Sequence, residues 1–146
     1  MQHRSLETPS TRPAQSRKKT GRRAPTIVLA DDSILQRMTL RALLEAEGYQ
    51  VLEAGDGGEV IDLVRMTRPD LILMDVAMPT MDGVTTARRI RRAKDAIARV
   101  PIVFVTALGA AVDRETALAA GGNDYLVKPI SQRELLRSVE RHVKDA

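Results

Sequence analysis

The chain has 146 residues, of which 43% are hydrophobic, so it is long enough to form one domain with a substantial core. It contains no cysteine, which excludes disulfide bonds, thiolate metal sites and cysteine nucleophiles. No apolar run approaches the roughly 18 residues of a membrane span, and the amino terminus lacks the apolar segment of a secretory signal, so we expect a cytoplasmic protein.

Charge is unevenly distributed along the chain. The net charge is +4, but residues 1–25 hold seven Lys or Arg and one acid, whereas the remainder holds 16 basic and 18 acidic residues. These first residues are poor in apolar side chains, so we expect a disordered basic tail. Its basic run, Arg17–Arg23, could contact nucleic acid, anionic lipid or an acidic protein face, although a solubilising extension explains it more simply. A nucleic-acid role would rest on this tail alone.

Short apolar runs alternate with helical patterns from Thr26 onward. Five units of this kind with short links predict an α/β fold in which helices cover both faces of a parallel sheet. We expect one domain over residues 26–146. The expected strands cover residues 26–30, 50–54, 71–74, 102–105 and 125–127, and the expected helices cover residues 33–47, 58–67, 84–95, 111–120 and a segment that begins at Ser131.

The helical patterns also predict which side chains face the core. Gly48 is expected to end the first helix, and Ser131 with Glu134 has the pattern of a capping box. The third helix should expose a basic face, which is more simply a solvated surface than a docking site. The residues expected on or near the inward face of the first helix are Ile34, Leu35, Met38, Ala42 and Leu43, and those of the basic face are Arg88, Arg89, Arg91, Arg92 and Lys94.

Asp75 follows the apolar run Leu71–Met74, so a buried strand delivers a carboxylate to a loop. Other strands also end in polar groups, and the carboxyl ends of parallel strands are where open α/β sheets bind ligands. Three carboxylates crowded there repel each other unless a cation lies among them. With no His or Cys nearby, the ligands are hard oxygens that suit Mg²⁺ or Mn²⁺. The residues gathered at this edge are Asp31, Asp32, Asp75, Thr106 and Lys128.

Each of these residues also has a purely structural explanation. Asp75 could make a turn or cap the next helix, and Asp31 and Asp32 could cap the first helix. Thr106 could be an ordinary hydroxyl at a strand end, and Tyr125 could be a plain core aromatic residue. Packing explains poorly why three acids and a lysine would be desolvated together, which favours a functional site.

Five motifs together resemble the receiver domain of two-component response regulators. They are Ala30-Asp31-Asp32, Leu73-Met74-Asp75, Met78-Pro79 with Gly83, Val105-Thr106-Ala107, and Tyr125-Leu126-Val127-Lys128-Pro129. The motifs follow one another in the family's order, and the resemblance runs from about Thr26 to Lys144. It implies a flavodoxin-like fold with strand order 2-1-3-4-5.

The resemblance also implies a role for each matching residue. Asp75 would accept a phosphoryl group from the phosphohistidine of a histidine kinase, and Lys128 would pair with Asp75 and then with that group. Asp31, Asp32, Asp75 and the backbone carbonyl of Ala77 would hold Mg²⁺. Thr106 would move toward the phosphoryl group, and Tyr125 would follow inward and change the face formed by the fourth helix, fifth strand and fifth helix. Pro129 would follow a cis peptide bond.

The resemblance implies that two further positions lie near the phosphoryl group, and both are apolar in this chain. Ala77 lies two residues beyond Asp75, and Leu108 lies two residues beyond Thr106. Neither side chain can orient an attacking water molecule, so we expect the aspartyl phosphate to be hydrolysed slowly.

The chain ends shortly after the last expected helix, so we expect a stand-alone receiver, similar to the chemotaxis regulators, whose output is the docking of a partner protein. A phosphorelay intermediate that passes its phosphoryl group to a histidine phosphotransfer protein is the main alternative. A phosphatase with an aspartate nucleophile would fit less well, because that class uses a DxD motif and the acids here are adjacent. A flavin-binding protein is disfavoured by an aromatic content of 2%.

Overall fold

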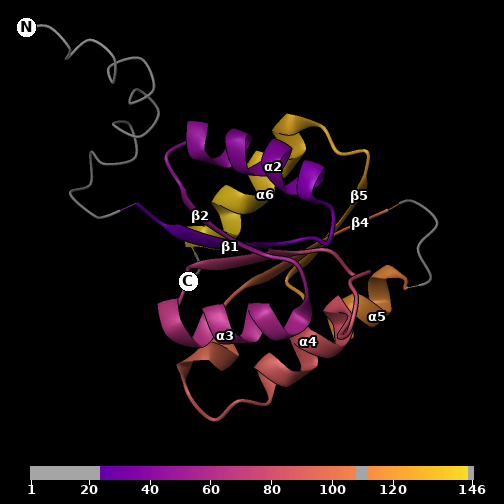
Figure 1. Ribbon diagram of the computed structural model, residues 1–146. Helices are drawn as coiled ribbons and strands as arrows, with labels where there is room; N and C mark the ends of the chain where they lie inside the picture. The colour runs from indigo at the N-terminus through magenta and orange to yellow at the C-terminus, as the bar shows by residue number, and fades with distance from the viewer. Residues whose placement is uncertain (1–23, 108–111, 145–146) are drawn as a thin grey trace, which may run out of the picture.

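The computed structural model describes residues 24–107 and 112–144, so most of the expected basic tail lies outside the described residues. Its five strands are parallel and lie in the order β2-β1-β3-β4-β5, which confirms the flavodoxin-like fold (Figure 1). In chain order the elements are β1 (Thr26–Ala30), α2 (Ile34–Ala46), β2 (Gln50–Ala54), α3 (Gly57–Thr67), β3 (Leu71–Met74), α4 (Gly83–Arg91), the 3₁₀ helix η4 (Ala96–Arg99), β4 (Ile102–Ala107), α5 (Arg114–Ala119), β5 (Asp124–Lys128) and α6 (Gln132–Lys144).

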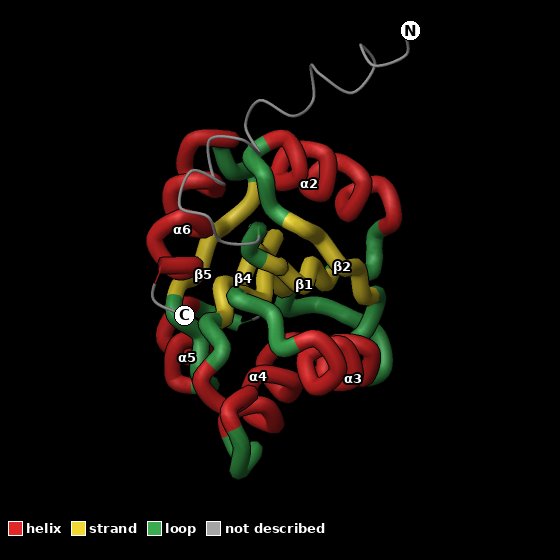
Figure 2. Tube along the Cα trace, turned by 90° about the vertical axis from the view of Figure 1, so that its left-hand side faces the viewer, coloured by secondary structure: helices red, strands yellow, loops and turns green. Residues whose placement is uncertain are grey.

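The sheet lies between two layers of helices. Helices α2 and α6 cover one face, and α3, α4 and α5 cover the other (Figure 2). Successive side chains of a strand point to opposite faces, so Leu71 and Leu73 of β3 join the core beneath α2 and α6, whereas Ile72 and Met74 join the core beneath the other helices. All four residues are at most 1% exposed. Burial on both faces explains why this strand is continuously apolar.

Each α-helix begins after a Ser or Asp whose side-chain oxygen accepts a backbone N–H from the helix's first turn. Such caps satisfy donors that have no partner within the helix. The capping residues are Ser33, Asp56, Asp82, Asp113 and Ser131, with donor–acceptor distances between 2.7 and 3.2 Å.

Within the described residues, no helix combines the length and apolar character needed to cross a membrane.

The prediction for the inward face of α2 was largely wrong. Ile34, Leu35 and Met38 are 66%, 72% and 60% exposed. The residues that pack on the sheet are Leu40, Leu43 and Leu44, of which only Leu43 belongs to the predicted set. Apolar residues surround this helix on several sides, so the 3.6-residue period did not identify its buried face. Gly48 lies where the helix ends and has φ +95°, the conformation expected of a terminating glycine.

The prediction for the third helix was correct at its start and wrong at its end. Helix α4 ends at Arg91, and the short helix η4 follows it. Arg91 is not part of an exposed basic face. Its guanidinium donates hydrogen bonds to the backbone carbonyls of Ala98, Val100 and Gly121 and to the side chain of Asn123. Arg91 therefore ties the end of α4 to the loop before β5.

The loop between β3 and α4 contains a strained turn. Met81 N donates to Pro79 O at 2.6 Å, which closes a three-residue γ-turn around Thr80. Thr80 has φ +69° and is exposed. A positive φ is unfavourable for a β-branched residue because its Cβ substituents crowd the backbone, and the γ-turn of this hand is rare and strained.

We predict that Thr80→Gly increases the free energy of unfolding by about 1 kcal/mol, because glycine adopts a positive φ without the Cβ clash. Chemical denaturation followed by circular dichroism measures this change. Thr80→Val keeps the β-branch and is the matched control, for which we expect no gain. A stability of Thr80→Gly equal to or below that of wild type would show that the turn is not strained.

Candidate functional site

A lysine and two buried carboxylates meet at the carboxyl edge of the sheet. Lys128 Nζ lies 3.2 Å from Asp31 Oδ2 and 3.5 Å from Asp75 Oδ2. Asp31 and Asp75 are 3% and 8% exposed, and Lys128 is partly buried. Ion pairs this far from solvent are screened weakly, so they restrain all three side chains.

Asp32 completes a cluster of three carboxylates. Asp31, Asp32 and Asp75 each offer one oxygen, and these oxygens all lie within 4.8 Å of one another. Asp32 is exposed, and no described residue forms a hydrogen bond or ion pair with its carboxylate. Carboxylate oxygens with a side open to solvent match the preference of Mg²⁺, which keeps several water ligands. The donor set therefore fits a hard divalent cation.

Burial shifts the titration of the central acid. Desolvation raises the pKa of the Asp75 carboxyl above its ordinary value. The hydrogen bond from Ala77 N and the positive charge of Lys128 lower this pKa in part, whereas the negative charge of Asp31 raises it further. Positive charge close to Asp75 therefore favours its ionised form.

The backbone around Asp75 holds the carboxylate in place. Asp75 N donates to Ala30 O at 2.9 Å, and Asp75 Oδ1 accepts from Ala77 N at 3.0 Å. Gly83 N donates to Val76 O at 2.8 Å, and a Cβ on Gly83 would lie 2.3 Å from the carbonyl oxygen of Asp75. The glycine of the motif is thus required so that α4 can begin directly against the backbone of Asp75.

The structural explanations of Asp31 and Asp75 hold only in part. Asp31 Oδ1 accepts from Ser33 N at 2.9 Å, and Asp75 makes the equivalent turn with Ala77. Neither acid caps a helix, because Ser33 caps α2 and Asp82 caps α4. One oxygen each of Asp31 and Asp75 therefore remains directed toward Lys128 and the cluster.

Thr106 lies at the same edge of the sheet. It is the residue before Ala107, which pairs in register with Lys128. Thr106 is 1% exposed, and its Oγ1 has no hydrogen-bond partner among the described residues. A buried hydroxyl without a partner is costly, so its presence calls for an explanation.

Tyr125 connects this edge to the helix layer. It is partly buried, and its hydroxyl donates to the backbone carbonyl of Val112 at 2.6 Å. Val112 lies just before α5, so the tyrosine links β5 to the start of that helix. The Lys128–Pro129 peptide bond is cis. Ala77 is exposed beside Asp75, whereas Leu108 lies outside the described residues.

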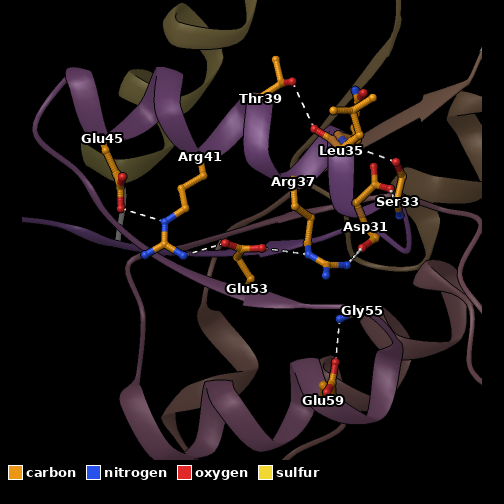
Figure 3. Close-up of polar contacts among 11 residues, drawn as sticks. Asp31, Ser33, Leu35, Arg37, Thr39, Arg41, Glu45, Glu53, Gly55 and Glu59 are labelled. Carbon is orange, nitrogen blue, oxygen red and sulfur yellow. Dashed lines mark hydrogen bonds and ion pairs between the residues drawn. The ribbon is translucent and has the colours of Figure 1, made fainter.

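Arg37 contacts the site and was not singled out from the sequence. It lies on α2, where its guanidinium donates to the backbone carbonyl of Asp31 and to Glu53 of β2 (Figure 3). Arginines are frequent in this chain and Arg37 belongs to none of the recognised motifs. Only the packing of α2 beside β2 brings its partners together.

Comparison with known proteins agrees with the geometry. The chain is 41% identical over 125 residues to the probable transcriptional regulator ycf27 of Galdieria sulphuraria, a match that covers 84% of this chain and 48% of that protein. It is 34% identical over 113 residues to the protein PilH of Pseudomonas aeruginosa, covering 77% of this chain and 93% of PilH. The chain thus spans about half the length of the ycf27 proteins and most of PilH.

A solved structure is also similar. The receiver domain of the sensor histidine kinase PA1611 from Pseudomonas aeruginosa PAO1, which has a magnesium ion coordinated in its active-site cleft, superposes with a TM-score of 0.76. It is 36% identical in sequence, and the match covers 83% of this chain and 98% of that domain. The family model of the response regulator receiver domain matches residues 27–140. The chain therefore belongs to the response regulator receiver domain family.

Proposed function

We propose that this chain accepts a phosphoryl group on Asp75 in a reaction that requires Mg²⁺, and that phosphorylation changes its binding to a partner protein. The observation that carries the proposal is the placement of Lys128 between Asp31 and Asp75, at an edge where three carboxylate oxygens converge. This arrangement suits a reaction in which an anion approaches a carboxylate nucleophile.

The residues divide the chemistry among them. Asp31, Asp32, Asp75 and the carbonyl of Ala77 would hold Mg²⁺, or Mn²⁺ in its place, and the bound ion would supply positive charge to the phosphoryl oxygens. An oxygen of Asp75 attacks phosphorus while the bond from phosphorus to the donor nitrogen or oxygen breaks, and the donor keeps the electron pair. Lys128 moves its ion pair from the carboxylate to a phosphoryl oxygen.

The hydroxyl of Thr106, which has no hydrogen-bond partner in the described part of the chain, supports a switch. A phosphoryl group on Asp75 would add about 1.5 to 2 negative charges and new acceptor oxygens, to which this hydroxyl can donate. Movement of Thr106 would open space for Tyr125, whose hydroxyl would then leave Val112. The face formed by α5, β5 and α6 would change as a result and bind a partner differently.

A phosphodonor protein also needs a place to dock. Ile34, Leu35 and Met38 are exposed on the first turns of α2, directly after the acidic pair of the site. Exposed large apolar residues that lie together often mark an interaction surface. We assign this surface to the phosphohistidine donor, which is a histidine kinase or a histidine phosphotransfer protein.

We propose two modes by which the phosphorylated chain could pass on its signal. The match to 93% of the length of PilH supports a stand-alone regulator, whose output we propose to be the binding of a partner. The similarity to the receiver domain of a sensor histidine kinase supports the alternative of a phosphorelay intermediate. Chasing labelled protein with a histidine phosphotransfer protein distinguishes them, because only a relay intermediate passes its label to histidine.

We predict that wild-type protein gains the mass of one phosphoryl group when it is incubated with acetyl phosphate and Mg²⁺, and that Asp75→Asn does not, because the amide is not a nucleophile. Intact-protein mass spectrometry measures the gain. Asp62→Asn, which removes an exposed carboxylate on α3, is the matched control and should be modified like wild type. Equal modification of Asp75→Asn would refute the assignment.

We predict that phosphorylated protein persists for minutes or longer, because the side chain of Ala77 cannot orient water. Ala77→Asn should shorten this lifetime, since its amide can hydrogen-bond an attacking water. Loss of the phosphoryl group, followed by mass after removal of the donor, gives the rate. Ala77→Val is the apolar control and should resemble wild type. A wild-type half-life of seconds would contradict the prediction.

A further inference from the structure

We propose that Arg37 is a positioning residue for the divalent-ion site, because it fixes the peptide unit that joins Asp31 to Asp32. The inference rests on the proposed function, since it assigns a role toward the ion that these acids would hold. Arg37 lies too far along α2 in sequence to belong to the acidic motif, and its backbone N–H donates to Ser33 O at 3.0 Å as part of the helix.

The guanidinium of Arg37 bridges strand β2 and the loop that follows β1 (Figure 3). Its Nε donates to Glu53 Oε1 of β2 at 2.9 Å, and one terminal nitrogen donates to the backbone carbonyl of Asp31. The Arg37 side chain is 17% exposed. A planar guanidinium can serve two acceptors in fixed directions at once, which a lysine ammonium cannot reproduce.

Glu53 is itself held from both sides. Its second carboxylate oxygen accepts from Arg41 at 2.6 Å, and Arg41 also pairs with Glu45. The hydrogen bonds from Arg41 and then from Arg37 lower the pKa of the Glu53 carboxyl, so it is ionised at neutral pH. The negative charge of Glu53 offsets the positive charge of Arg37, which would otherwise repel a cation bound nearby.

The hydrogen bond from Arg37 to the carbonyl of Asp31 determines where Asp32 lies. A peptide unit is planar, so fixing the carbonyl of Asp31 also fixes the direction in which the chain enters Asp32. The carboxylates of Asp31 and Asp75 are restrained by Lys128 and by backbone N–H groups, but no described residue forms a hydrogen bond or ion pair with the carboxylate of Asp32. Its position therefore depends on the backbone, and the backbone depends in part on Arg37.

The test compares the affinity of the unphosphorylated protein for Mg²⁺, measured by isothermal titration calorimetry, among single variants. Partners that orient metal ligands affect affinity strongly, so we expect Arg37→Gln and Arg37→Lys to weaken binding about tenfold. Arg41→Gln is the matched control, because Arg41 lies on the same helix and contacts the same Glu53 but not Asp31. It should bind Mg²⁺ like wild type.

A second measurement separates positioning from a general loss of structure. In phosphorylation by acetyl phosphate, the Mg²⁺ concentration that gives half the maximal rate should rise in the Arg37 variants, while the rate at saturating Mg²⁺ stays near that of wild type. Wild-type affinity in both Arg37 variants, or an equal loss in Arg41→Gln, would overturn this inference alone. Failure of the wild-type protein to bind Mg²⁺ would overturn the proposed function with it.

Discussion

The repulsion among three carboxylates at one end of the sheet is the constraint on which the rest of the structure depends. At separations within 4.8 Å, each pair of ionised acids costs about 3 kcal/mol or more for an effective dielectric constant near 20. Lys128 is the only described cation paired with the cluster, so two negative charges remain uncompensated when all three acids are ionised. Under the proposed function, a divalent cation would supply that missing charge, and a phosphoryl group could then approach an acid that would otherwise repel it.

The fold holds these charges together although nearby residues adopt strained or unsatisfied conformations. The strands place acids at the ends of β1 and β3 and the lysine at the end of β5, while the helices on both faces bury the strands and keep their ends in register. Gly83 lets α4 approach the backbone of Asp75, and Thr80 adopts an unfavourable positive φ in the same loop. Thr106 is buried without a hydrogen-bond partner among the described residues. Strain and unsatisfied groups of this kind concentrate where a protein binds or reacts.

The fold and the members of the acidic cluster could be predicted because both follow from the apolar runs that form the strands and from the polar residues after them. Alternating apolar runs fix a parallel sheet, and polar residues that follow such runs must meet at one edge. The exposed residues of α2 and the half-buried side chain of Arg91 were predicted wrongly. Apolar residues on several sides of α2 hide its inward face, and Arg91 acquires its partners only when η4 and the loop before β5 pack beside it. Arg37 was missed for a similar reason, since its contact with Glu53 exists only in the folded chain.

The most direct test of the central claim maps the modified residue chemically. Sodium borohydride reduces an aspartyl phosphate to homoserine, which remains in the chain and is located by peptide mass spectrometry. After incubation with acetyl phosphate and Mg²⁺, the account predicts homoserine at position 75, and none when a chelator removes the ion. Homoserine at another aspartate, or an equal yield at position 75 with the chelator present, would contradict the account.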